Sequence, residues 1–454
     1  MTAPGNAREA LALVTDDFAE LPFAGEPSDG DGPIDWPGYG RSRAAAAARS
    51  GEAESVVCGT GTVGGVRTVL VSFEFGFLGG SIGEGTGARV AAAHAHAREH
   101  RLPVTVLPAT GGSRMHEGMR ALVQLQRLAG ESALTRAAGL PQLAVLRDPT
   151  TGGGWATLGA GADVVLALPG AQVGFAGSRV RPRDADPAAY TAESQLVHGH
   201  VDAVVPAAEL RTVLGRWLAL LTRPARGPVP PPYALGGTEP SASGREAVAR
   251  ARRPERPRAE AYLDEVFTER AELSGDRAGG TDPGTLCGFG RLPDGRTAAY
   301  AAQCGTATRP AGFRTAARLV RLAGRLGIPV LTLIDTPGAA NDAEAERAGA
   351  GPAIAELFGA VAEARVPVTS LLIGEGGSGG ALALAAPGRT WATPDAYFSV
   401  IAPELATAIL KRPPEDADGT ADLLRLCPED LVALGVARGV VGARPEDASA
   451  PGRG

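Results

Sequence analysis

Short, mostly apolar runs alternate with glycine-rich turns and helical segments along this chain. Four of these runs are predicted to be strands, and they cover residues Val104–Leu107, Gln142–Leu146, Val330–Ile334 and Val366–Ile373. A turn containing glycine or proline follows each run, and a helical pattern follows most of the turns. Strands that alternate with helices at this pace predict mixed α/β layers.

Hairpins and longer helices complete the predicted elements. Stretches rich in β-branched residues predict one hairpin over Val56–Phe77, around Gly64-Gly65, and another over Leu286–Ala301, around Asp294-Gly295. The principal helices are predicted over Ala7–Val14, Arg43–Arg49, Ala88–His100, Gly118–Ala138, Arg256–Glu272 and Phe313–Leu326. Pro257 is compatible with the first turn of its helix.

The predicted elements recur at a nearly constant offset, which indicates an internal duplication. Pro103 and Pro141 match Pro329 and Pro367 at an offset of 226 residues. The pair Gly152-Gly153 matches Gly379-Gly380 at 227, and Cys58-Gly-Thr-Gly61 matches Cys287-Gly-Phe-Gly290 at 229. Two tandem copies of one fold explain this order. We expect an N-terminal domain over residues 1–225, a proline-rich linker over 226–244 and a C-terminal domain over 245–454.

Composition narrows the function classes. The chain has 454 residues and a net charge of −6, which argues against nucleic-acid binding. Its four cysteines are scattered and contain no Cys-x-x-Cys pair, so neither a zinc ribbon nor a disulfide framework is expected and a reducing cytoplasm fits. The first residues lack the pattern of a signal peptide, and no uncharged apolar run approaches the length of a membrane span.

Three familiar motifs near the second glycine-rich turn are unconvincing. Gly374–Gly379 matches the dinucleotide pattern Gly-x-Gly-x-x-Gly, but it comes late in its half of the chain and its counterpart near Gly152 lacks the pattern. Ser378 sits in a Gly-x-Ser-x-Gly elbow, yet no histidine follows it, as the corresponding hydrolases require. A phosphate loop of Walker type needs a Gly-Lys pair, and the single lysine, Lys411, lies elsewhere.

The histidines do not predict a metal site. His94, His96 and His100 form one metal-like cluster, but helical spacing on a surface helix explains them, and no metal ligand set is assigned. His116 follows a glycine turn at a strand end, where an orienting role is favoured over that of a general base.

The remaining hypothesis is chemistry that uses backbone N–H groups. Glycine turns at helix N-termini present N–H donors that have no partner inside the helix. Aimed donors of this kind stabilise an enolate formed next to a thioester. Gly79-Gly80 and Gly111-Gly112 add two further bare turns to the matched pair. The alternative is that these glycines only allow a helix to pack closely on a strand.

These turns resemble the carboxyltransferase component of biotin-dependent acetyl-CoA carboxylase, in the crotonase superfamily. The first half resembles the β subunit, and its carrying stretches are Phe75–Gly83, Ala109–Gly118, Asp148–Gly153 and Gly174–Gly177. The second half resembles the α subunit, and its carrying stretches are Arg253–Pro257, Glu272–Ala278, Leu331–Gly338, Ile373–Leu384 and Tyr397–Pro403.

The resemblance implies two tandem crotonase-like spiral domains of α/β class. It implies an acyl-CoA bound mainly by the first half and carboxybiotin bound by the second. Gly152 and Gly153 would hold the thioester oxygen, and Gly379, Gly380 and the amide of Ala381 would hold the ureido oxygen of biotin. The other substrate-binding residues expected are Gly79, Gly80, Gly111, Gly112, Arg114 and Trp155.

The resemblance also implies partner proteins and an oligomeric state, and alternative functions remain open. This sequence contains no Met-Lys-Met biotinylation motif, so biotin carboxylase and the biotin carrier are expected to be separate proteins. A homodimer or a trimer of dimers is expected. Trp155 stands at a position that is usually small and could narrow the acyl pocket, and residues 302–311 form a shortened segment. A biotin-independent decarboxylase of malonyl-type thioesters and a non-catalytic scaffold remain the other hypotheses.

Overall fold

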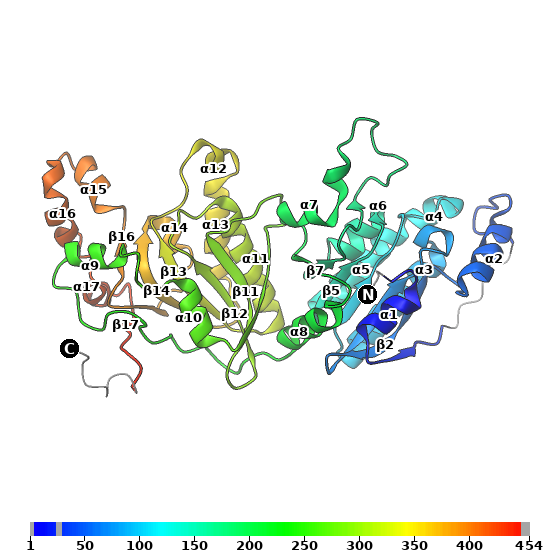
Figure 1. Ribbon diagram of the computed structural model, residues 1–454, viewed down its shortest axis with the longest axis horizontal. Helices are drawn as coiled ribbons and strands as arrows, with labels where there is room; N and C mark the ends of the chain where they lie inside the picture. The colour runs from blue at the N-terminus through cyan, green and yellow to red at the C-terminus, as the bar shows by residue number, and fades with distance from the viewer. Residues whose placement is uncertain (1–3, 24–29, 446–454) are drawn as a thin grey trace. The chain divides into compact units, whose positions relative to one another are not determined.

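The computed structural model describes residues 4–23 and 30–445 (Figure 1). The chain divides into two compact units. The first comprises Met1–Thr222 with Arg277–Gly279, and the second comprises Arg223–Asp276 with Gly280–Gly454. The proline-rich residues 226–244 therefore group with the second unit. In the described part of the chain, no helix is both long and apolar enough to span a bilayer.

The first unit is built on one mixed sheet. Its strands, in spatial order, are β1 (Asp17–Glu20), β2 (Val56–Val63), β3 (Val66–Phe73), β4 (Val104–Leu107), β5 (Gln142–Leu146), β7 (Val164–Ala167) and β9 (Ala203–Val204). The first three strands pair antiparallel, and every pairing from β3 onward is parallel. A short parallel pair, β6 (Thr150–Thr151) with β8 (Val173–Gly174), lies off this sheet.

The second unit repeats this topology. Its strands, in the same spatial order, are β10 (Glu269–Glu272), β11 (Thr285–Arg291), β12 (Thr297–Gln303), β13 (Val330–Thr336), β14 (Val368–Gly377), β15 (Thr390–Ala392) and β17 (Gly439–Val440), and β16 (Tyr397–Ser399) pairs with the end of β14. Val104 pairs with Gln142 in the first sheet, and Val330 pairs with Val368 in the second, both shifted by 226 residues. The predicted duplication of an α/β fold is confirmed in these registers.

The helices follow the strands in both units. In the first unit they are α1 (Ala7–Val14), α2 (Tyr39–Ser50), α3 (Glu84–His100), α4 (Gly118–Leu122), α5 (Gln124–Ala137), α6 (Gly152–Gly154), α7 (Ala192–Val197) and α8 (Leu210–Thr222). In the second they are α9 (Gly244–Ala251), α10 (Ala259–Val266), α11 (Pro310–Leu326), α12 (Ala343–Arg347), α13 (Ala350–Ala362), α14 (Ser378–Leu382), α15 (Pro403–Ile409), α16 (Ala417–Leu423) and α17 (Pro428–Ala433).

Helices cover both faces of the first sheet, which explains why its strands are apolar on both sides. Val69, Val71 and Phe73 of β3 join a buried cluster with residues of α3 and α5. The alternate residue Ser72 points the other way, and its hydroxyl donates to the Ala7 carbonyl of α1 at 3.0 Å. Strands buried on two faces read as continuous apolar runs, as in the four runs that predicted them.

One predicted helix is wrong. The segment Arg256–Glu272 contains the shorter helix α10, after which Glu269–Glu272 forms the edge strand β10, paired antiparallel with β11. Val266, Phe267 and Thr268 end the helix, and β-branched and aromatic residues favour extended backbone. Its counterpart β1 was not predicted either. The predicted helix Gly118–Ala138 is divided into α4 and α5 at Val123.

His94 is a buried neutral side chain in the packing of α3 on α5. It is 2% exposed, and its Nδ1 lies 2.9 Å from the Thr135 hydroxyl. Burial, which penalises the charged imidazolium, lowers the pKa of His94 to about 4, and Arg98 adds to this effect while Glu131 opposes it. A histidine in this setting is a core residue rather than a metal ligand.

We expect His94 to make the first unit less stable in mild acid. The unfolded chain binds a proton at His94 below about pH 6.5, whereas the folded unit binds it only near pH 4, so stability falls as the pH drops through this window. His94→Gln removes this contribution. The difference in unfolding free energy between the wild type and His94→Gln should therefore shrink by up to about 1.4 kcal/mol for each pH unit of acidification. Denaturation at pH 7.5 and at pH 5 measures this difference. The exposed His198→Gln is the control, and a constant difference for His94→Gln would contradict the expectation.

Candidate functional site

Three glycine turns of the first unit meet at the carboxyl ends of β3, β4 and β5. The Gly111 N–H donates to the Gly79 carbonyl at 2.9 Å, and the Thr151 N–H donates to the Thr110 carbonyl at 2.9 Å. A Cβ added to Gly112 would lie 3.6 Å from both the Gly152 Cα and the Gly153 nitrogen. The structure therefore brings together all six glycines that the sequence placed in this site, and we call them the first cradle: Gly79, Gly80, Gly111, Gly112, Gly152 and Gly153.

Close backbone contact requires glycine at some of these positions but not at others. A Cβ on Gly80 would lie 2.0 Å from the Ala109 carbonyl oxygen, a distance that excludes any side chain. Gly80, Gly112 and Gly152 also have positive φ, of 62°, 102° and 62°. Gly111 has neither constraint, because its φ is not positive and a Cβ would meet only the Gly79 oxygen, at 3.5 Å.

The hydrogen bonds of the first cradle determine which N–H groups are available. The Gly152 N–H donates to the Phe175 carbonyl at 3.0 Å, and the Gly112 N–H donates to the Thr110 hydroxyl at 3.0 Å. No turn, loop or cap hydrogen bond within residues 4–23 and 30–445 uses the N–H of Gly79 or Gly153. Gly153 lies in the opening turn of α6, where N–H groups lack an intrahelical partner, and Gly79 lies in the short 3-10 turn Leu78–Gly80 with a φ of 68°. The geometry thus favours Gly79 with Gly153 as donors, rather than Gly152 with Gly153.

Arg114 lies beneath this cradle rather than on its surface. Its side chain is 1% exposed and forms ion pairs with Glu54 and with Glu117, the latter at 3.1 Å. The Tyr39 hydroxyl donates to Glu117 at 2.5 Å. Burial alone would raise the pKa of Glu54, but the guanidinium of Arg114 holds that pKa below its usual value. These contacts do not support the predicted direct contact of Arg114 with substrate.

The main chain of Arg114 connects this charge cluster to the cradle. Its N–H donates to the Ile82 carbonyl at 2.9 Å, and the Ile82 N–H donates to the Gly112 carbonyl at 2.8 Å. The Ser81 carbonyl, two residues after Gly79, accepts from the Arg114 guanidinium at 2.8 Å. Arg114 is therefore placed to position the turns that carry Gly79 and Gly112.

Trp155 follows the first cradle in a π-helical turn, Trp155–Gly159. A Cβ on Gly159 would lie 2.5 Å from the indole Cε3, so the ring rests directly on that glycine. The indole also packs against the buried cluster that includes Leu146 and Val173. Part of the large side chain thus fills space under the turn, and its predicted effect on the acyl pocket stays a prediction.

The second cradle, Ser378 to Ala381, lies where β14 enters α14. A Cβ on Gly377 would lie 1.9 Å from the Pro337 carbonyl oxygen, and one on Gly380 would lie 2.5 Å from the Ala339 nitrogen. Packing therefore imposes these two glycines. Gly379 differs, since its φ is not positive and, apart from its chain neighbours and the backbone of its own helix, no described atom lies within 4 Å of a Cβ built on it. A glycine that the fold does not need, at a helix N-terminus, is consistent with close approach by a ligand.

Buried charges fix the strand that carries the second cradle. The fully buried Asp335 accepts from Arg256 Nη2 at 2.5 Å, from Arg258 Nη1 at 3.1 Å and from the Glu375 N–H at 3.1 Å. Arg256 Nη1 also donates to the Ile373 carbonyl at 3.3 Å. The sequence analysis assigned no role to these residues. An aspartate after the apolar run Val330–Ile334 was the available signal, because an acid at the end of a buried strand needs a partner.

A cavity opens beside the second cradle. It has a volume of about 380 Å³, and its lining is mostly apolar: Ser378, Gly379, Leu382, Phe398, Ser399, Val400, Leu424, Arg425, Leu426, Leu431, Leu434 and Val436. A mostly apolar cavity of this size with a few polar groups in its lining is typical of small-molecule sites. Ala381 is fully buried and does not line this cavity.

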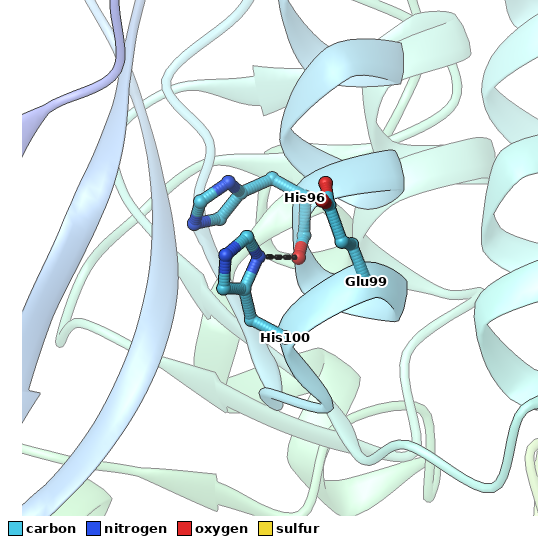
Figure 2. A group of neighbouring side chains, drawn as sticks. All are labelled: His96, Glu99 and His100. Atoms are coloured by element: carbon cyan, nitrogen blue, oxygen red, sulfur yellow. Dashed lines mark hydrogen bonds between the residues drawn. The ribbon is translucent and has the colours of Figure 1, made fainter.

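The histidine cluster lies on the surface of α3. Figure 2 shows the imidazoles of His96 and His100 on one side of this helix, and their centroids are 4.0 Å apart. The potential ligand atoms of His96, Glu99 and His100 lie within 4.8 Å of one another, but Glu99 and His100 are exposed. His116 is stacked on Tyr39 at 5.1 Å. Neither arrangement places a histidine among the cradle contacts described above.

Two solved structures share the fold of this chain. The transcarboxylase 12S core, determined with hydrolysed methylmalonyl-coenzyme A, gives a TM-score of 0.78 at 21% identity, and the match covers 96% of this chain and 86% of that one. A single-chain, multi-domain long-chain acyl-CoA carboxylase gives 0.73 at 20% identity over 96% of this chain and 44% of that one. This chain therefore has the fold seen in these transcarboxylase and acyl-CoA carboxylase structures.

Sequence comparison gives the family. Residues 241–449 match the model described as acetyl co-enzyme A carboxylase carboxyltransferase-like. The acetyl-coenzyme A carboxylase carboxyl transferase subunits beta/alpha of Saccharopolyspora erythraea are 39% identical, over 90% of this chain and 76% of that protein. The protein of the same name from Salinispora arenicola is 40% identical, over 98% and 82%. This chain belongs to the acetyl-CoA carboxylase carboxyltransferase family, and the predicted family and crotonase fold are confirmed.

Substitution of Arg114 tests whether its buried ion pairs stabilise the structure beneath the first cradle. Replacing it with Met leaves Glu54 and Glu117 buried without a cation, so we expect Arg114→Met to destabilise the first unit by about 3–5 kcal/mol. Denaturant unfolding measures the change. Adding Glu54→Gln removes one stranded charge and should restore part of the loss. A single variant as stable as the wild type would contradict the assigned role.

Proposed function

We propose that this chain moves a carboxyl group from carboxybiotin, held on a separate carrier protein, to the α-carbon of an acyl-CoA. Acetyl-CoA is the proposed acceptor and malonyl-CoA the product, in line with the names of the relatives. The observation that carries the proposal is the repeated cradle. Each copy presents N–H groups at a helix N-terminus. In the second copy Gly379 faces open space, and neither packing nor its φ requires a glycine there.

The first cradle is suited to an enolate. With the thioester oxygen bound to the N–H groups of Gly79 and Gly153, negative charge that develops on this oxygen during removal of the α-proton is stabilised. One donor of this kind lowers a barrier by about 3 kcal/mol. Because the turns are held by backbone contacts and by the Arg114 cluster, their dipoles need little reorganisation during the reaction.

The second cradle and its cavity fit the bicyclic head of biotin. The apolar walls, which include Phe398 and Leu426, suit the sulfur-containing ring, and the N–H groups of Gly379, Gly380 and Ala381 suit the ureido oxygen. Carboxybiotin, when bound, supplies the carboxyl group. The chain's own contribution is to hold the ureido oxygen and to stabilise the negative charge that it acquires as the carboxyl group leaves.

Biotin carboxylase and a biotin carrier are the proposed partners, and self-association is proposed as well. The single lysine, Lys411, lacks flanking methionines, so this sequence offers no Met-Lys-Met attachment site for biotin. Large apolar side chains are exposed in the C-terminal part of the second unit, including Val400 at 72%, Ile409 at 67% and Leu423 at 72%. Such a surface is typical of protein contacts, and it supports a homo-oligomer.

The decisive experiment is turnover of malonyl-CoA and methylmalonyl-CoA by the purified chain, with and without free biotin. The transfer run in reverse should convert malonyl-CoA to acetyl-CoA only when biotin is present to accept the carboxyl group. Equal rates without biotin would establish the decarboxylase instead. Binding of acyl-CoA with no turnover under either condition would favour the scaffold.

Gly379→Ala tests the second cradle without disturbing the fold. A methyl group at this position meets no described protein atom, and alanine suits a helix better than glycine, so the melting temperature should not fall. The methyl group would occupy the space assigned to the ureido group, and we expect the biotin-dependent rate to fall at least tenfold. Gly359→Ala in α13 is the control, because that Cβ also meets nothing within 4 Å. Equal activity of the two variants would contradict the assigned cradle.

A further inference from the structure

Ser378 has a backbone conformation that serine rarely adopts. Its φ is 58°, in the left-handed region, and it is the first residue of α14. The structurally equivalent residue in the first unit is Gly152, 226 positions earlier, which opens α6 with a φ of 62°. The sequence pairing of Gly152 with Gly379 at an offset of 227 is therefore one residue out. The same strained turn carries a hydrogen in one copy and a hydroxymethyl group in the other.

Local packing does not account for this side chain. Non-glycine residues in the left-handed region are strained, and such strain persists where the surroundings or a function maintain it. The Ser378 side chain is exposed rather than packed against the core. Glycine would fit the turn with less strain, as it does in the first unit.

Ser378 lies where a bound ligand could contact its side chain. Ser378 and Gly379 line the same cavity of about 380 Å³, whose other walls are mostly apolar. A hydroxyl there is a polar group beside the first-turn N–H donors of α14. Biotin presents one strong acceptor to such a group, the ureido oxygen, and its rings are otherwise weakly polar.

We propose that Ser378 is a substrate-binding residue whose hydroxyl donates a hydrogen bond to the ureido oxygen of biotin, beside the Gly379 N–H. This assignment rests on the proposed function. It makes the two cradles chemically distinct. The first binds a thioester oxygen with backbone donors alone, and the second adds a hydroxyl donor for the more strongly accepting oxygen of a urea.

Two variants separate ligand binding from strain. Ser378→Ala removes the hydroxyl and keeps a Cβ in the left-handed turn, whereas Ser378→Gly removes both. Each should raise the KM for free biotin, or lower kcat/KM for biotin, by about tenfold in malonyl-CoA decarboxylation, with the KM for malonyl-CoA unchanged. Ser378→Gly should also raise the melting temperature, by roughly 2–4 °C, because it relieves the backbone.

Lys411→Gly is the matched control. Lys411 also has a positive φ, of 56°, but it does not line the cavity, so glycine there should raise the melting temperature and leave both KM values unchanged. If Ser378→Ala and Ser378→Gly kept the wild-type kinetics for biotin, the assignment of Ser378 would be overturned and the proposed function would stand. A lower melting temperature in Ser378→Gly would also overturn it, by showing a structural role. Turnover that is independent of biotin in the wild type would overturn the assignment together with the proposed function.

Discussion

Direct backbone-to-backbone contact between turns on neighbouring strands is the constraint on which both cradles depend. In the first unit the Gly80 turn touches Ala109, and Gly112 touches Gly152. In the second unit Gly377 and Gly380 touch Pro337 and Ala339. No side chain fits at Gly80, Gly377 or Gly380, so close contact between main chains limits where the short helices that follow can lie. Their first-turn N–H groups are aimed before any ligand arrives, which is the condition for efficient stabilisation of charge.

Each unit supports its turns from below with buried charge, but with different residues. The first uses the guanidinium of Arg114 between Glu54 and Glu117, and the second uses the carboxylate of Asp335 between Arg256 and Arg258. Buried ion pairs add little net stability compared with well-packed apolar groups. The presence of buried charge beside the turns of both copies is better explained by the orientation it imposes, because charged hydrogen bonds hold particular carbonyl and N–H groups in one direction.

The sequence was sufficient for the buried parallel strands, the duplication and the family. Buried parallel strands such as Val104–Leu107 and Gln142–Leu146 are continuous apolar runs, and they lie where the pattern placed them. The edge strand Glu269–Glu272 was missed because its stability comes from pairing with β11, which local composition does not encode. The availability of N–H groups was also out of reach, since it depends on the Phe175 carbonyl that accepts from Gly152. The consecutive glycines Gly152 to Gly154 left the internal alignment ambiguous by one residue, and only the φ angles resolve it.

The open faces of Ser378 and Gly379 have a consequence for how a duplicated protein acquires a second specificity. After a gene segment is copied, most positions of the turn are not free to vary, because a change at Gly377 or Gly380 would collide with the neighbouring main chain. Positions 378 and 379 tolerate substitution without such a collision, so mutations that alter recognition can accumulate there while the scaffold is preserved. Within this turn, divergence is thereby confined to two residues, at the point where a ligand would be touched.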